Sequence, residues 1–181
     1  MNYYWVIVLV LLFASCKNKS TSNRNDVESK VVVYKDIEGA KEINLEVYDF
    51  NGFKNFLNKK DDKVYVLNFW ATWCAPCVKE LPYFEKINEI YNIQNVEVIL
   101  VSLDFPHLYD SKLKPFIKEK NLKSKVIALD DADMNTWIPQ IDKNWSGSIP
   151  ATIIYNKNHS KFFEKSFTYE GLESEIIKLL N

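Results

Sequence analysis

Residues 64–77 of the chain read VYVLNFWATWCAPC, and this stretch decides the fold. Its first half, Val64–Trp70, is an almost continuous run of β-branched and aromatic residues, which is typical of a strand buried on both faces of a sheet. Apolar residues at helical spacing follow from about Pro76 to Tyr91. The sequence therefore predicts a buried strand that leads into a helix, with Cys74 and Cys77 at the point where one becomes the other.

The position of the two cysteines affects their chemistry. A thiolate at the N-terminus of a helix faces unpaired backbone N–H groups and the positive end of the helix dipole. In C-x-x-C motifs the thiol pKa falls from about 8.5 to between about 3.5 and 7.5. We therefore expect Cys74 to be the exposed nucleophile of thiol–disulfide exchange. Cys77, one turn further into the helix, is expected to be the shielded thiol that resolves the mixed disulfide.

Three other interpretations of the C-x-x-C pair remain open: a structural disulfide, half of a zinc site, and two buried inert cysteines. A disulfide that closes so small a loop stabilises a protein by only about 2 kcal/mol in the chain-entropy model. A zinc site would need a second Cys or His pair, and His107 and His159 are isolated in the sequence. The strand-to-helix position argues against inert cysteines. We favour redox chemistry and expect no metal ion and no cofactor.

The N-terminus carries the features of an export signal. Residues 5–14 form an uncharged apolar run, which is shorter than the roughly 20 residues that span a bilayer. The run ends in Ala14-Ser15-Cys16, which resembles the lipobox of bacterial lipoproteins. The resemblance implies cleavage before Cys16 and acylation of its thiol. An uncleaved apolar anchor, or a plain signal peptide in which Cys16 is incidental, is the alternative.

These features predict the domain organisation. We expect residues 1–15 to be a lipoprotein-type signal peptide and residues 16–30 to be a lipid-anchored flexible tether. Residues 17–30 contain one aliphatic residue, Val27, and no aromatic residue, so they cannot bury enough surface to fold. Residues 31–181 would form the folded domain. The expected location is the cell envelope, with the domain anchored to a membrane and facing the periplasm or the exterior.

Patterning along the rest of the chain predicts an α/β domain with a mixed central sheet flanked by helices. The composition, with 47% hydrophobic residues, fits a packed core, and the net charge of −1 comes from acids and bases that are mixed along the chain. The sequence has no basic stripe of the kind that would indicate a nucleic-acid partner. Strands are expected at Val31–Tyr34, Ile43–Tyr48, Val64–Trp70, Val96–Leu103, Val126–Leu129, Ala151–Tyr155 and Lys161–Ser166. Helices are expected around Phe53–Leu57 and at Pro76–Tyr91, Leu113–Lys120, Met134–Ile141 and Leu172–Leu180.

Ten consecutive residues, Asn68 to Cys77, followed by Glu80-Leu81-Pro82, closely resemble the active-site segment of TlpA/ResA-like proteins. These proteins are extracytoplasmic thiol–disulfide oxidoreductases of the thioredoxin superfamily. A second segment, Gly147–Thr152, resembles the cis-proline segment of that superfamily. The resemblance implies a thioredoxin-like fold with an N-terminal strand extension and a strand–helix insertion, which Lys112–Leu129 would supply.

The resemblance also implies candidate site residues around the cysteines. A cis Ile149–Pro150 bond would lie against the disulfide, and the neighbouring backbone would pair with an extended stretch of substrate. Pro150 is therefore a candidate catalytic residue, and a trans proline that begins a strand is the alternative. Trp73 and Ile149 are candidate substrate contacts. Trp70 and Trp73 are also expected to pack around the thiols.

A carboxyl group close to the cysteines is a further candidate. Glu80 follows Cys77 by three residues and therefore lies on the same face of the expected helix. It matches the family's acid beside the active site and would exchange a proton with Cys77. The alternative is a solvated carboxylate on the helix surface. Asn68 stands where thioredoxins proper carry a buried aspartate, so that acid cannot act in this chain.

Together these residues predict an enzyme that reduces disulfides of exported proteins and receives its electrons from a membrane partner. The alternative from another class is a copper-binding or copper-delivery module, in which His107 would be a third ligand beside the two cysteines. Copper carriers on this fold more often have C-x-x-x-C with a distal histidine, so the shorter spacing disfavours that function. Peroxidases related to this fold place the reactive thiol outside a C-x-x-C motif, so we rank peroxidase activity last.

Overall fold

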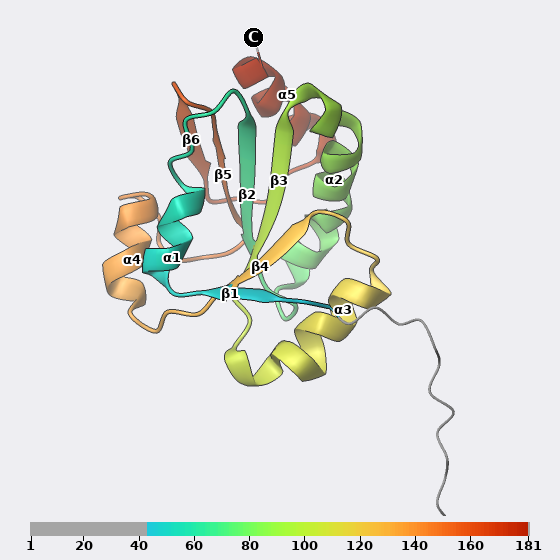
Figure 1. Cartoon of the computed structure of the whole chain (residues 1–181), viewed down its shortest axis with the longest axis vertical. Coiled ribbons are helices and arrows are strands. Elements are labelled where there is room, and N and C mark those ends of the chain that lie inside the picture. Colours follow the sequence, from blue (N-terminus) through green and yellow to red (C-terminus); the bar gives the residue numbers. More distant parts are fainter. Residues whose placement is uncertain (1–42, 181) are drawn as a thin grey trace, which may run out of the picture. The chain divides into compact units, whose positions relative to one another are not determined.

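The computed structural model describes residues 43–180. In this part of the chain, six strands form one sheet in the order β1-β4-β3-β2-β5-β6 (Figure 1). The neighbours from β1 to β2 are parallel, whereas β5 is antiparallel to both β2 and β6. The predicted mixed sheet is confirmed. The strands are β1 (Glu46–Tyr48), β2 (Val64–Trp70), β3 (Val96–Ser102), β4 (Lys125–Leu129), β5 (Ala151–Tyr155) and β6 (Ser160–Phe163).

Strand β2 lies at the centre of the sheet and is buried along its whole length. Successive side chains of a strand point to opposite faces. Val64, Val66 and Trp70 accordingly belong to one apolar cluster and Tyr65, Leu67 and Phe69 to another. Both faces of the sheet therefore have their own core, which explains why β2 reads as a continuous apolar run.

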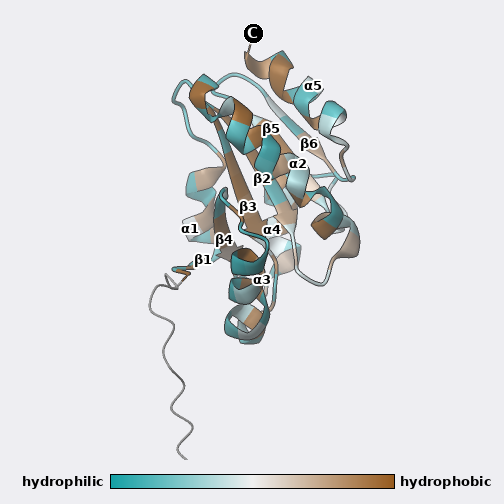
Figure 2. Cartoon of the chain, turned by 90° about the vertical axis from the view of Figure 1, so that its right-hand side faces the viewer, coloured by the Kyte–Doolittle hydropathy of each residue, from teal (hydrophilic) through white to brown (hydrophobic). Residues whose placement is uncertain are grey.

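Helices cover both of these faces. The first cluster includes buried residues of α2 (Ala75–Tyr91), α3 (Lys114–Glu119) and α5 (Tyr169–Leu180). The second includes residues of α1 (Phe50–Phe53) and α4 (Met134–Ile141). Figure 2 shows brown, apolar strands at the centre of the sheet and hydrophilic teal residues on the helices that cover it. The chain thus forms an α/β layered structure, as expected for a thioredoxin-like fold.

Helix α2 positions the chemistry. Its buried residues follow helical spacing: Leu81, Phe84 and Ile87 pack on the sheet, and Cys77 and Glu80 are buried before them. Pro76 lies in the first turn of α2, where backbone N–H groups have no acceptor within the helix. The missing N–H of proline therefore costs no hydrogen bond there.

The expected insertion and N-terminal extension are both present. Helix α3 and strand β4 lie within the predicted range Lys112–Leu129. Strand β1 pairs with the edge of β4, with Glu46 opposite Ile127. The part of the predicted extension at Val31–Tyr34 lies outside the described residues, as do Cys16, the predicted signal peptide and the tether.

Several boundaries differ from the sequence prediction, among them the start of β1 at Glu46 instead of Ile43 and the start of α5 at Tyr169 instead of Leu172. The short first helix begins at Phe50, before Gly52, because the Asp49 side chain caps it by accepting a hydrogen bond from the Gly52 N–H at 2.8 Å. Strand β6 ends at Phe163 and not at Ser166. Its partner β5 begins only at Ala151, directly after Pro150, which has no N–H to extend the ladder.

No helix between residues 43 and 180 combines the length and the apolar character that crossing a bilayer requires.

Candidate active site

Cys74 and Cys77 form a disulfide at the N-terminus of α2, with their Cα atoms 5.3 Å apart. Cys74 is the residue that caps the helix, and its sulfur accepts a hydrogen bond from the Cys77 backbone N–H at 3.3 Å. A thiolate formed on Cys74 would therefore face a backbone donor and the positive end of the helix dipole. The predicted strand-to-helix placement of the pair is confirmed.

The second half of the site comes from the loop before β5. The Ile149–Pro150 peptide bond is cis, as the sequence segment predicted. The Ile149 carbonyl oxygen lies 3.7 Å from the Cys74 sulfur. Because β5 runs antiparallel to β2, this loop and the cysteines meet at the same end of the two strands.

The exposure of the cysteines corrects one expectation. Cys74 is only 6% exposed and Cys77 is fully buried. Cys74 is the more accessible of the two, but the prediction of an exposed Cys74 is wrong for the disulfide form, since the Ile149 backbone approaches its sulfur closely.

Glu80 lies on α2 three residues after Cys77 and is buried, with 1% of its surface exposed. Its carboxylate accepts hydrogen bonds from the Phe167 backbone N–H at 2.7 Å and from the Asn68 side-chain amide at 3.1 Å. Burial raises the pKa of Glu80 to about 7, while these two hydrogen bonds lower it. The alternative of a solvated surface carboxylate is wrong, and the group can change protonation near neutral pH.

Asn68 links Glu80 to the sheet. Its amide nitrogen donates both to Glu80 and to the Thr152 hydroxyl, each at 3.1 Å. Asn68 projects from β2 toward α2, and Thr152 is its direct partner on β5. The acid is thus held by β2 and by the segment before α5, and β5 in turn holds Asn68 through Thr152.

The two tryptophans of the motif have different environments. Trp70 is fully buried and packs on Phe116 with ring centroids 5.5 Å apart, so its predicted packing role is confirmed. Trp73 is 55% exposed and lies against Phe105, which is itself 54% exposed. The expectation that Trp73 packs around the thiols is therefore wrong, whereas its exposure is compatible with a contact to substrate.

Phe105 was missed by sequence reasoning, and so was Asp104. Both follow the carboxyl end of β3, which is a common position for functional side chains in sheets of this kind. Their position directly after a predicted parallel strand is the feature of the sequence that could have marked them as candidate functional residues.

The two histidines lie in different parts of the structure. His107 lies on Phe105, with ring centroids 5.8 Å apart, and His159 lies in the turn between β5 and β6. Within residues 43–180, no three His, Cys, Asp or Glu side chains are placed to hold a metal ion.

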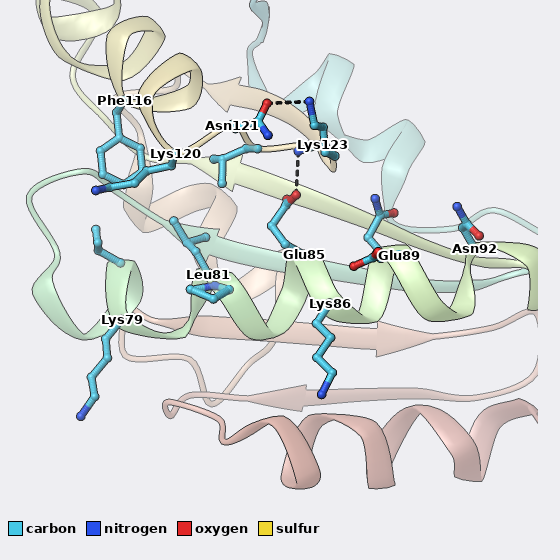
Figure 3. Close-up of a pocket in the computed structure, with 14 residues that line it drawn as sticks. Lys79, Leu81, Glu85, Lys86, Glu89, Asn92, Phe116, Lys120, Asn121 and Lys123 are labelled. Atoms are coloured by element: carbon cyan, nitrogen blue, oxygen red, sulfur yellow. Dashed lines mark hydrogen bonds between the residues drawn. The ribbon is translucent and has the colours of Figure 1, made fainter.

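A surface groove of about 980 Å³ runs along α2 between Val78 and Asn92 (Figure 3). Leu81, Phe116 and Leu122 contribute apolar surface to it, and the Glu85 carboxylate accepts hydrogen bonds from the backbone of Lys123 at 2.6 Å and of Ser124 at 3.1 Å. These bonds tie α2 to the loop between α3 and β4. The groove is lined by none of the candidate site residues.

Comparison with known proteins identifies the family. Residues 38–160 match the model of the AhpC/TSA family. The chain belongs to that family. It is 33% identical over 139 residues to the thiol-disulfide oxidoreductase ResA of Bacillus cereus, covering 75% of each chain. It is 27% identical over 172 residues to ResA of Geobacillus thermodenitrificans, covering 94% of this chain and 91% of the relative.

Solved structures support the same fold. A secreted thiol-disulfide isomerase from Corynebacterium glutamicum aligns with a TM-score of 0.56 at 22% identity, over 71% of this chain and 74% of that one. StoA from Bacillus subtilis aligns with a TM-score of 0.50 at 23% identity, over 64% and 83%. The family member described here is therefore a thiol–disulfide oxidoreductase of the thioredoxin type, and the expected ResA-like resemblance is confirmed.

Proposed function

We propose that this AhpC/TSA-family protein reduces disulfides of exported proteins through Cys74 and Cys77 while anchored to a membrane by Cys16. The observation that carries the proposal is the Cys74–Cys77 disulfide at the start of α2 with the Ile149 carbonyl oxygen 3.7 Å from the Cys74 sulfur. The extracytoplasmic location rests on the signal-like N-terminus and on relatives such as the secreted Corynebacterium isomerase.

The reaction proceeds in two exchanges. The Cys74 thiolate attacks one sulfur of the substrate disulfide, forms a mixed disulfide and releases the first substrate thiolate. Cys77 then attacks the Cys74 sulfur and releases the second substrate thiolate. The substrate gains two electrons, and the protein is left with the Cys74–Cys77 disulfide that the structure contains. A dithiol donor at the membrane must supply two electrons for the next cycle.

Glu80 accepts the proton that Cys77 loses in the second exchange. Cys77 must lose its proton to attack, and a carboxyl group with a pKa of about 7, three residues further along α2, is suited to accept it. Trp73 and the Ile149 backbone would contact the substrate chain on either side of Cys74, and Pro150 would hold the Ile149 carbonyl in place.

Reduction is favoured over oxidation by the residues between the cysteines. A strong oxidant needs a thiolate stabilised by several donors or cations, but Ala75 has no polar side chain and Pro76 has no N–H. What remains is the helix terminus, worth at most about 2 kcal/mol. Because about 30 mV corresponds to 1.4 kcal/mol for two electrons, we expect a potential nearer to thioredoxin's −270 mV than to about −120 mV.

Two measurements test the proposal. A Cys77→Ser variant should trap mixed disulfides with exported proteins through Cys74, and the Cys74→Ser variant should trap far fewer. A glutathione redox titration should place the potential well below about −160 mV. A higher value would recast the protein as an oxidase or isomerase, and equal trapping by both variants would remove the assigned roles.

A further inference from the structure

Three exposed rings lie next to each other beside the disulfide. Trp73, which precedes Cys74, lies against Phe105 with ring centroids 6.2 Å apart and planes inclined by 20°. Phe105 in turn lies on His107, with centroids 5.8 Å apart and planes inclined by 17°. We call Trp73, Phe105 and His107 the aromatic platform.

A buried carboxylate holds the two loops that carry the platform. Asp104 is 2% exposed and accepts hydrogen bonds from the Thr72 N–H at 3.0 Å, the Thr72 hydroxyl at 2.5 Å and the Ser102 hydroxyl at 2.8 Å. Thr72 immediately precedes Trp73, and Asp104 immediately precedes Phe105. The ends of β2 and β3 are therefore tied together directly beneath the rings.

Keeping Trp73 and Phe105 half exposed to water costs free energy, which is recovered when a partner covers the rings. Exposed aromatic rings gain free energy when they are covered, and rings that are already fixed lose little conformational entropy when a partner binds. Aromatic residues are also enriched among the side chains that carry most of the energy of protein interfaces. A pair of half-exposed rings, carried on two loops that Asp104 ties together next to a reactive disulfide, has the properties of a docking surface.

The position of the platform identifies its occupant. The Ile149 backbone approaches the Cys74 sulfur at 3.7 Å, while Trp73 is bonded directly to Cys74 in the chain. Any polypeptide whose disulfide reaches Cys74 must therefore pass close to Trp73. A side chain next to the attacked cysteine can then extend over Phe105.

We propose that the aromatic platform binds an apolar or aromatic side chain of the substrate polypeptide, adjacent to the cysteine that Cys74 attacks. This inference rests on the proposed function and specifies its substrates: disulfide-containing polypeptides with a large apolar residue beside one cysteine. Phe105 is then a specificity-determining residue, and Asp104 is a positioning residue that keeps Trp73 and Phe105 side by side.

The test compares substrates that differ only at the proposed contact. The reduced full-length protein, in detergent, is assayed with two disulfide-bonded peptides that carry Phe or Gly next to one cysteine, and with glutathione disulfide. Phe105→Ser removes the central ring. Ile93→Ser is the matched control, because Ile93 is 87% exposed but follows the far end of α2, about 25 Å from the cysteines at 1.5 Å per residue.

We expect Phe105→Ser to lower kcat/KM for the Phe peptide about tenfold, mostly by raising KM. A tenfold change corresponds to about 1.4 kcal/mol. The Gly peptide and glutathione disulfide should react as with the wild type, and Ile93→Ser should change none of the three reactions. An unchanged Phe peptide would overturn the proposal, as would an equal loss on all three substrates, which would mean that Phe105 acts through the disulfide itself.

A third result would also overturn it. If Phe105→Ser converts a dimer to a monomer in sedimentation without altering any of the three reactions, the platform is a contact between copies of this chain. Failure of the proposed function looks different from all of these outcomes, because the wild-type protein would then exchange with none of the disulfides.

Discussion

Replacing Glu80 with Gln tests whether the buried carboxyl group is protonated near neutral pH. The side chain is 1% exposed, and burial raises its pKa from an ordinary value of 4.5 to about 7, against the opposing effect of hydrogen bonds from Phe167 and Asn68. At about 1.36 kcal/mol per unit of pKa, this difference is worth about 3 kcal/mol of folding free energy.

The sign follows from proton binding. Between pH 4.5 and about 7, the folded protein holds a proton on Glu80 that the unfolded chain has released. The free energy of unfolding therefore falls as the pH rises through this window, and the loss is complete above the folded pKa. Gln does not titrate, so the Glu80→Gln variant lacks this contribution while every other group titrates as before.

Gln also suits the surrounding hydrogen bonds. Its carbonyl can accept from the Phe167 N–H in place of the carboxylate. Its amide can donate to Asn68 if the Asn68 side-chain amide turns by half a rotation, which presents an oxygen that has no hydrogen-bond partner in this structure. Because this turn places the Asn68 N–H2 group where the oxygen had no partner, we expect the variant to fold with a stability that is lowered equally at every pH.

Urea unfolding of the oxidised proteins across this pH range provides the measurement. We expect the wild type to lose about 3 kcal/mol more than Glu80→Gln between about pH 4 and pH 8. Glu89→Gln, an exposed carboxylate on the same helix, is the control and should follow the wild type. Profiles of wild type and Glu80→Gln that stay parallel within about 0.5 kcal/mol would refute the assignment of a raised pKa.

Three further predictions concern other parts of the chain. The Glu164 carboxylate accepts hydrogen bonds from the Ser146 hydroxyl and from the backbone N–H groups of Ser146 and Ser148, which lower its pKa. This contact with the loop before Pro150 is therefore present above the ordinary pKa of a glutamate and is lost as the pH falls through the lower pKa of the folded state. Glu164→Gln should speed amide hydrogen exchange at Ser148 about threefold at neutral pH, and unchanged exchange would show that the contact does not restrain the loop. In the reduced protein, Cys74 should alkylate well below pH 8 and faster than its partner cysteine, and the reverse order would exchange their roles. Cys16→Ser should abolish fatty-acid labelling and leave the chain unprocessed, whereas full labelling of the variant would exclude Cys16 as the acylated residue.

The β2–α2 unit was predictable because local signals agree there. A continuous apolar run fixes Val64–Trp70 as a central strand, and the structure has it between the same residues. The cis bond before Pro150 was expected from the resemblance of Gly147–Thr152 to the cis-proline segment of the thioredoxin superfamily.

Features that depend on distant residues could not be predicted. Glu80 is buried because the segment around Phe167, 87 residues away, closes over it, and nothing in the helix sequence shows this. A phenylalanine such as Phe105 is most often a core residue, and its exposure depends on how the loop after β3 meets the loop after β2. Both cases depend on contacts between segments that are far apart in the chain, whereas hydrophobic periodicity in the sequence reports only on local secondary structure.

The hydrogen bond from Phe167 to Glu80 has a consequence for when the protein becomes active. The carboxyl group acquires its raised pKa only after β5, β6 and the segment before α5 have docked against α2. A chain that is still emerging from an export channel, or one cut before Phe167, carries an ordinary glutamic acid in open water, ionised at neutral pH. Such a carboxylate can still accept a proton, but it is a weaker base toward Cys77 than the buried group with its pKa of about 7. Thiol–disulfide exchange therefore reaches its full rate only when the domain has folded completely. A partly exported or truncated chain reacts slowly with the disulfides of other exported proteins.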